Sequence, residues 1–153
     1  MTKPATDNPT LQLTLDTYVK LIRSVNALSN RLIEKQTFGD LTHSQFGVLE
    51  AIFHLGPLSQ TEISAKLLKS GGNISLVVDN LEKRQLVSRR RSSTDRRLVI
   101  VSLTSAGQEL INEIFPLHAL AIQSELDILT PSEQEQLGYL SRKLGKGGIG
   151  HED

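Results

Sequence analysis

The chain has 153 residues, of which 38% are hydrophobic and 22% are charged, a composition typical of one compact globular domain. It contains no cysteine, which excludes disulfide-stapled scaffolds, thiolate metal sites and thiol redox chemistry. A chain of this length buries enough surface to fold without a structural metal.

The charges cancel overall but are unevenly distributed. Lys and Arg number 17, as do Asp and Glu, yet residues 1–65 have a balance of −1, residues 66–97 of +6 and residues 98–153 of −5. A concentrated positive segment in a neutral protein is typical of a phosphate-binding surface. The sequence has no apolar run long enough to cross a membrane and no leader-like start, so we expect a cytoplasmic protein without membrane contact.

The N-terminal part predicts a tail followed by one long helix. Residues 1–9 lack apolar periodicity and are expected to be disordered. From Leu11 to Leu32, apolar residues recur at steps of three and four, which predicts a helix over about 10–36.

Two capping boxes mark the next helix starts. Thr42 with Gln45, and Ser59 with Glu62, have the spacing at which each side chain satisfies a free amide of a new helix. The first box predicts a helix over 43–55, because Gly and Pro follow it. The second predicts a shorter helix of about ten residues.

A flexible turn, Ser70-Gly71-Gly72, is predicted after the short helix, and a further helix follows it. Two short helices joined by a tight glycine-containing turn form a helix-turn-helix. The inward face of the second helix is predicted to be Ile74, Val77, Val78 and Leu81.

The pattern then changes from helix to strand. Three consecutive arginines, a polar turn at 92–95 and the β-rich stretch 98–103 predict a β-hairpin. Thr104 is expected to cap a long helix ending near Thr130, and Thr130-Pro131 with Glu133 starts a last helix. The inward face of the long helix is predicted to be Leu110, Ile114, Leu117, Ala121, Ile122 and Leu129.

The predicted fold is mainly α, a winged helix-turn-helix with a β-hairpin wing in a single domain over 10–145. Its DNA-binding lobe covers about 42–104, and residues 146–153 are expected to be flexible. The helices at about 10–36 and 105–145 carry more apolar surface than a small winged helix covers. They therefore predict a homodimer.

Two groups of residues are candidates for binding double-stranded DNA. In the second helix of the helix-turn-helix, polar side chains suit base edges, Leu76 suits a thymine methyl group, and the glycines allow close approach to phosphate. In the hairpin, Asp95 is placed to orient Arg97 for a narrow minor groove, and Asp79 is expected to lie off the DNA face or to pair with a basic neighbour. The candidates are Ser70, Gly71, Gly72, Asn73, Ser75, Leu76, Asn80, Lys83, Arg89, Arg90, Arg91, Asp95, Arg96 and Arg97.

The sequence contains no pattern that indicates catalysis, cofactor binding or metal binding. No nucleophile elbow and no Gly-rich phosphate loop occurs, so neither an enzyme nor a cofactor is expected. The four histidines are far apart and lack metal-ligand spacing, so no metal site is expected. His118 is expected to be a packed polar residue near the dimer contact.

The chain resembles the multiple antibiotic resistance regulator (MarR) family in the segments LTHSQFGVLEAI, GPLSQTEISAKL and SGGNISLVVDNLEKRQLVSRRRSSTDRRLVIVSLTSAG. The resemblance covers about residues 10–145 and is most specific at Asp95-Arg96-Arg97, followed by Leu103-Thr104 and Gly107. It implies a winged-helix homodimer that binds an inverted-repeat operator, as a repressor, and releases it when a small ligand binds. The stretch KLLKSGGNISLVVDNLEKR, together with Ile114-Phe115-Pro116-Leu117-His118, is similar to the branch that responds to quinones and catechols, which implies an aromatic, phenolic or quinone-like effector.

The same resemblance places an effector crevice near Tyr18, Phe46, Phe53 and His54, although each also fits a purely structural role. Gln85 stands where the family usually has a glycine with a left-handed backbone, which leaves the exit angle of the wing open.

Two other functions remain open from the sequence. The basic hairpin of a winged-helix protein-interaction module would grip an acidic partner. A DNA-binding regulator of the same fold would also work without a small-molecule effector.

Overall fold

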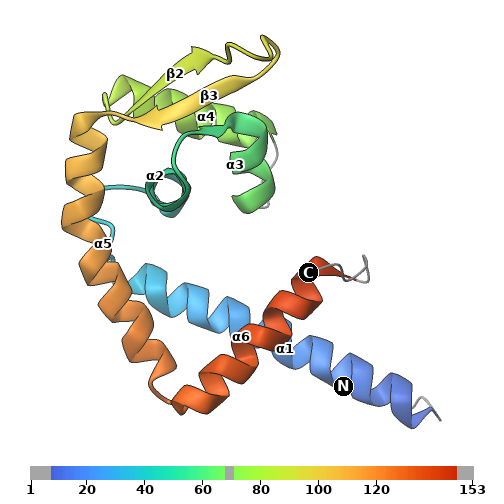
Figure 1. Cartoon of the computed structure of the whole chain (residues 1–153). Helices are drawn as coiled ribbons and strands as arrows, with labels where there is room; N and C mark the ends of the chain where they lie inside the picture. Colours follow the sequence, from blue (N-terminus) through green and yellow to red (C-terminus); the bar gives the residue numbers. More distant parts are fainter. Residues whose placement is uncertain (1–7, 68–70, 148–153) are drawn as a thin grey trace.

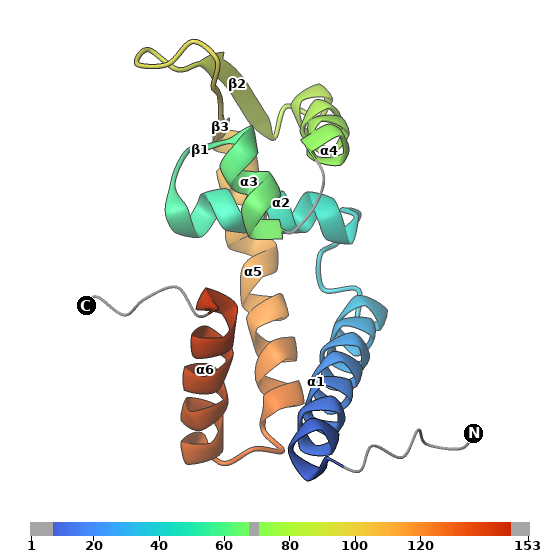
Figure 2. The same cartoon turned by 90° about the vertical axis from the view of Figure 1, so that its right-hand side faces the viewer.

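The structure is a computed structural model that describes residues 8–67 and 71–147. In these ranges it has six α-helices and a three-stranded sheet, which confirms the mainly α winged helix-turn-helix. A lobe that holds α2 (His43–Leu55), α3 (Gln60–Leu67), α4 (Gly71–Lys83) and the sheet lies at one end of the long helix α5 (Ser105–Leu126). α1 (Pro9–Glu34) and α6 (Pro131–Lys146) lie toward the other end of α5 (Figures 1 and 2). Within the described chain, no helix combines the length and hydropathy needed to span a membrane.

The first two helices begin at or within one residue of the predicted positions. α1 (Pro9–Glu34) follows Asn8, whose side chain accepts hydrogen bonds from the first free amides, so this helix starts one residue before the predicted position. α2 (His43–Leu55) opens with the predicted capping box of Thr42 and Gln45 and ends at Gly56, which has a φ of 77°.

The helix-turn-helix is formed by α3 (Gln60–Leu67) and α4 (Gly71–Lys83). The capping box of Ser59 and Glu62 is present, with amide-to-side-chain distances of 2.8 and 3.1 Å. The predicted turn is wrong in part, because Gly71 and Gly72 already belong to the helical backbone of α4. Ser70 lies outside the described residues.

The sheet has the strand order β1-β3-β2, with β1 (Leu58–Ser59), β2 (Val87–Arg91) and β3 (Val99–Leu103) all antiparallel. β2, β3 and their connection form the predicted hairpin, which we call the wing (residues 87–103). β1 was not predicted, because two residues are too short to show a periodicity.

The hydrophobic core lies inside the lobe, where α2, α3, α4 and the sheet meet the start of α5. All four residues predicted for the inward face of α4 are buried. The largest fully buried side chains include Phe46, Leu49, Ile63, Ile74, Leu81 and Ile111. The core therefore holds the helix-turn-helix and the base of the wing as one unit.

The two C-terminal helices differ in detail from the prediction. α5 (Ser105–Leu126) ends earlier than expected and leaves Leu129 in the connection, because Thr130 already caps α6 (Pro131–Lys146). Leu117 is 59% exposed rather than inward. The buried stripe of α5 runs through Ile111, Ile114, His118 and Ala121 at steps of three and four, and Leu117 falls beside it. Of the predicted tails, 1–7 and 148–153 lie outside the described residues. Pro9 and Lys146 were wrongly assigned to the tails, because Asn8 caps α1 and the last helix continues to its cap at Gly147.

Candidate nucleic-acid interface

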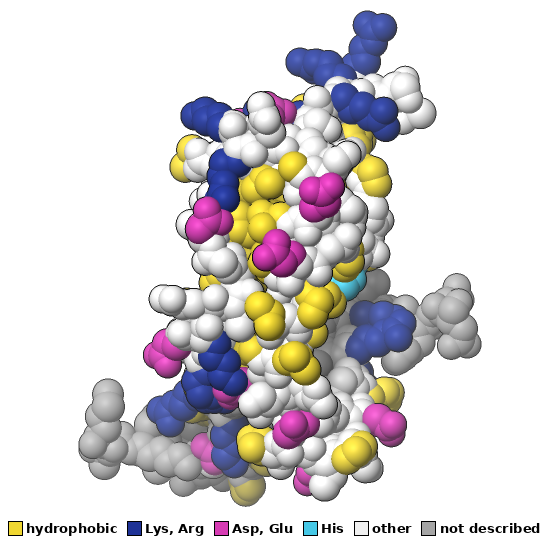
Figure 3. Space-filling view, turned by 90° about the vertical axis from the view of Figure 1, so that its left-hand side faces the viewer, with side chains coloured by type: hydrophobic (Ala, Val, Ile, Leu, Met, Phe, Trp, Pro, Cys, Tyr) yellow, Lys and Arg dark blue, Asp and Glu magenta, His cyan; other side chains and the backbone are white. Residues whose placement is uncertain are grey.

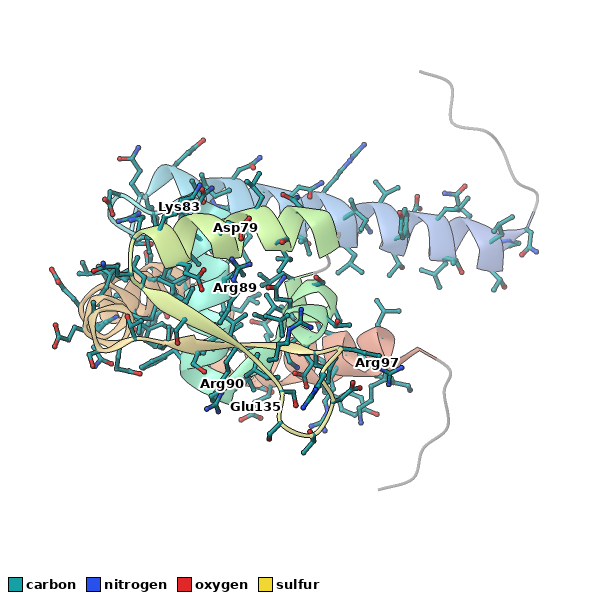
Figure 4. The ribbon with its side chains drawn as sticks, turned by 90° about the horizontal axis from the view of Figure 1, so that it is seen from above. Asp79, Lys83, Arg89, Arg90, Arg97 and Glu135 are labelled. Carbon is teal, nitrogen blue, oxygen red and sulfur yellow. The ribbon has the colours of Figure 1, made fainter. Side chains whose placement is uncertain are left out.

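α4 and the wing share one end of the lobe, because the buried face of α4 and the base of the wing pack on the same core. Seen from above, α4 lies alongside the hairpin, and Arg97 lies at the far tip of the wing (Figure 4). Of the predicted base-contacting residues, Asn73 and Leu76 are exposed and Ser75 and Asn80 are partly exposed. The predicted groups therefore meet at one end of the molecule.

At the wing tip, Arg97 and Asp95 form the expected pair. Arg97 donates from Nε and Nη2 to the two carboxylate oxygens of Asp95, both at 3.0 Å, and its backbone amide donates to the same carboxylate. These bonds hold the pKa of Asp95 below its usual value. The Arg97 side chain stays 90% exposed, so its orientation is fixed while it remains available to a ligand.

At the wing base, Arg89 points toward α4 and meets Asp79 (Figure 4). Its Nη2 lies 2.6 Å from an oxygen of Asp79 and 3.1 Å from an oxygen of Glu82. The bonds from Arg89 hold the pKa of Glu82 below its usual value, and those from Glu82 raise the pKa of Arg89. The expectation that Asp79 pairs with a basic neighbour is confirmed.

A second arginine anchors the end of α4, and the sequence analysis missed it. Arg84 Nη2 lies 2.9 Å from both carboxylate oxygens of Asp40, in the connection between α1 and α2. The hydrogen bonding from Arg84 is the main reason why the pKa of Asp40 lies below its usual value. The partners are 44 residues apart, so no local pattern could have indicated the pair.

The remaining basic side chains of this end are available for other partners. Among the described residues, the side chains of Lys83, Arg90 and Arg96 form neither a hydrogen bond nor an ion pair, and all three are exposed. Arg91 donates to the backbone oxygen of Arg96 at 2.9 Å. Lys and Arg side chains project from the wing end of the molecule in the space-filling view (Figure 3).

Comparisons with known proteins agree with this geometry. Residues 41–99 match the model of the MarR family. The chain is 36% identical over 123 residues to the HTH-type transcriptional regulator MhqR of Bacillus subtilis (strain 168), which covers 80% of this chain and 83% of MhqR. The protein belongs to the MarR family.

Two solved structures are similar over most of the chain. BpsR of Bordetella bronchiseptica, whose DNA binding is regulated by 6-hydroxynicotinic acid, is 29% identical with a TM-score of 0.70 and covers 82% of this chain and 98% of BpsR. Wild-type MarR from E. coli in its apo form is 28% identical with a TM-score of 0.66 and covers 82% of this chain and 93% of MarR. The protein is therefore a DNA-binding transcriptional regulator, and its relatives are regulators rather than enzymes.

The four residues predicted for an effector crevice are not brought together in this MarR-family fold. Phe46 is 1% exposed and packs against His118 with ring centroids 4.6 Å apart, so it belongs to the core. Tyr18 lies exposed on α1. Phe53 and His54 are neighbours, and both contact Phe115 of α5, with centroids 5.7 and 4.8 Å away. Phe115 was not among the predicted crevice residues, because only the tertiary fold places α5 beside the end of α2.

His118 is buried, as the sequence analysis expected for a packed residue. It is 7% exposed, and its Nδ1 lies 2.9 Å from the hydroxyl of Thr37. Burial holds its pKa below the usual value. Over residues 8–67 and 71–147, no three His, Asp or Glu side chains gather in a metal-binding cluster.

Proposed function

We propose that this MarR-family regulator is a homodimeric repressor that binds an inverted-repeat operator and releases it when a small aromatic effector binds. The observation that carries the proposal is Arg97, which Asp95 orients and which stays exposed at the tip of a wing beside α4. A two-fold axis would place two α4 helices in major grooves about 34 Å apart. The wing tips would then reach the adjacent minor grooves, where a narrow groove attracts arginine.

The contacts divide by chemistry. Asn73, Ser75, Leu76 and Asn80 on α4 are proposed to face base edges, and the amides at Gly71 and Gly72 to face a phosphate. Each phosphate neutralised by a cation contributes about −0.9 to the slope of log affinity against log salt. The phosphate-binding side chains are proposed to be Lys83, Arg90, Arg91 and Arg96.

The proposal of a dimer rests on apolar surface that one chain leaves uncovered. Neither α1 nor α6 has a buried residue in the described chain, although both are amphipathic. Burying such surface is the main favourable term in association. The exposed large apolar side chains of these two helices are Leu11, Leu13, Leu15, Tyr18, Val19, Ile22, Val25, Ile33, Leu137, Tyr139, Leu140 and Leu144.

Sedimentation equilibrium tests the dimer. We expect a dimer at micromolar concentration, and we expect Leu140→Lys to weaken it because a charge would be buried in the contact. Glu135→Lys introduces the same side chain on the exposed, opposite face of α6 and serves as the control. A stable monomer of the unaltered protein would refute the dimer.

The effector site is proposed to include Phe53 and His54 with Phe115, because these rings join the lobe to α5. An aromatic, phenolic or quinone-like molecule stacks on such rings. An effector that binds better to a conformation with misplaced α4 helices shifts the population away from DNA. Thermal shifts with phenolic and quinone compounds test this, and Phe53→Ala should reduce them. No shift with any such compound would indicate a regulator without a small-molecule effector.

Footprinting on the DNA that flanks the gene tests the operator. We expect a protected inverted repeat whose halves are about one helical turn apart. Binding should weaken steeply as salt rises. A protein-interaction module with an acidic partner would also bind in a salt-dependent way, but it would protect no discrete palindrome.

A further inference from the structure

We infer that Arg89 is a positioning residue, which fixes the wing relative to the recognition helix α4 through Asp79 and Glu82 and does not itself contact DNA. The inference rests on the proposed function, because its consequence is measured on the operator. It separates Arg89 from the other wing arginines, with which the sequence pattern groups it.

The face of the strand decides where Arg89 points. In β2, Arg89 pairs with Val101 of β3, a fully buried core residue, so both lie on the face turned toward the lobe. Arg90 pairs with Ile100 and lies on the opposite face. Figure 4 shows Arg89 directed toward α4 and Arg90 directed away from it.

Protein acceptors occupy all three side-chain nitrogens of Arg89. Nη2 bonds to both carboxylates, Nε lies 3.4 Å from Glu82, and Nη1 lies 3.5 Å from Gln60. The backbone amide of Arg89 also donates to Glu82 at 3.2 Å. A DNA phosphate would have to displace these partners. The described structure gives the side chain of Arg90 no such partner.

We call the contact of Arg89 with Asp79 and Glu82 the brace, and the positions of the two carboxylates suit it. Asp79 and Glu82 are three residues apart in α4, so they lie on one face of the helix. Both stand near the proposed DNA surface, where they would repel phosphate if Arg89 did not neutralise them. One guanidinium therefore ties the strand to the helix at two points.

The brace matters because the wing amplifies a change at its base. With a rise of about 3.3 Å per residue, the tip lies about 13 Å beyond Arg89, so a rotation of about 20° moves the tip by about 4 to 5 Å. The minor groove is only about 6 Å wide. Loss of the brace would therefore displace Arg97 from the groove.

Operator binding across a salt series tests the inference with Arg89→Gln and its neighbour Arg90→Gln. Both substitutions remove one positive charge from the same strand. We expect Arg90→Gln to make the salt slope shallower by about 0.9, because a phosphate contact is lost. We expect Arg89→Gln to weaken binding about tenfold and to lose more affinity and more of the salt slope than Arg90→Gln, because the displaced wing loses several contacts at once. A loss of affinity and slope in Arg89→Gln no larger than that in Arg90→Gln would overturn the inference.

Removal of the carboxylates gives a second test with opposite predictions. Asp79→Asn with Glu82→Gln makes the surface more positive, so binding should strengthen if Arg89 were a phosphate contact. The brace predicts weaker binding. Adding Arg89→Gln to this pair separates positioning from neutralisation, because no carboxylate remains to repel DNA. Weak binding of the triple variant supports the brace, and wild-type affinity would overturn it.

A measurement without DNA keeps the inference apart from the proposed function. The chain has no cysteine, so Ser93→Cys provides one attachment site for a spin label on the wing. We expect Arg89→Gln to increase the mobility of the label and Arg90→Gln to leave it unchanged. Equal mobility in the two variants would overturn the brace. A wild-type protein that binds no operator would refute the proposed function and leave this result intact.

Circular dichroism melting checks that the variants fold. If Arg89→Gln does not fold, Arg89→Lys replaces it, because lysine keeps the charge but lacks the fork that reaches both carboxylates. The lysine variant should show weaker operator binding and a more mobile label. Wild-type values for both would overturn the inference.

Discussion

Asp95 holds the guanidinium of Arg97 by two hydrogen bonds of 3.0 Å, yet the arginine remains almost wholly exposed at the wing tip. An ion pair at such an exposed position contributes little to folding. Its effect is to restrict the directions in which the guanidinium points, so that less rotational freedom is lost when DNA binds.

Arg97→Ala is expected to reduce operator affinity by about 1 to 3 kcal/mol, because a minor-groove contact is lost. Asp95→Asn should give a smaller loss, since the cation stays but its orientation is freed. A gel-shift titration measures both, with Ser93→Ala as the control on the same loop. An unchanged affinity of Arg97→Ala would show that the wing tip does not contact the operator.

Gln85 has a left-handed backbone with a φ of 60°, which settles the turn geometry that the sequence left open. Its carbonyl accepts a hydrogen bond of 2.6 Å from the Thr104 hydroxyl, which holds the turn in place. Gln85→Gly should raise the free energy of unfolding by about 0.5 to 1 kcal/mol, because glycine adopts this conformation without steric cost. Urea denaturation measures this free energy. Gln85→Ala keeps the Cβ atom, so an equal increase in that variant would show that the left-handed backbone at Gln85 is not strained.

Gly107 lies where α5 passes the start of the wing. A Cβ atom at this position would overlap the backbone oxygen of Leu86, which already accepts a bond of 3.1 Å from Thr104. Gly107→Ala should therefore destabilise the protein by about 3 kcal/mol. Gly138→Ala in exposed α6 has open space and should stabilise it by up to about 1 kcal/mol. Thermal unfolding compares the two, and equal melting temperatures would contradict the overlap.

His118 should make the folded state sensitive to mild acid. Burial holds its pKa below the usual value, with Glu50 opposing the shift and His43 adding to it. As pH falls through about 6.5, the unfolded chain gains a proton that the folded chain does not, so stability falls by up to about 1.4 kcal/mol per pH unit. The loss ends once the folded histidine also titrates.

Urea denaturation between about pH 5 and 7 measures this, above the range in which most carboxylates titrate. His118→Gln should flatten the pH dependence, and the exposed His54→Gln should keep it. The same slope in both variants would assign the sensitivity to another group.

Several parts of the interface could be predicted because their signals are local. The capping box of Thr42 and Gln45 lies within four residues, so it marked the start of α2 correctly. The pair of Asp95 and Arg97 spans three residues of one turn, and it was found for the same reason. In contrast, Arg84 meets Asp40 across 44 residues, and no pattern within either segment indicates that contact.

The sequence by itself determined the helices, the hairpin and the concentration of positive charge, because periodicity, caps and charge act between residues close in the chain. Only the tertiary structure decided what each arginine does. Arg89 and Arg90 are adjacent and chemically identical, but a strand turns neighbouring side chains to opposite faces, and packing on the core gave Arg89 the carboxylates of α4. The same packing buried Phe46 and placed Phe115 beside His54.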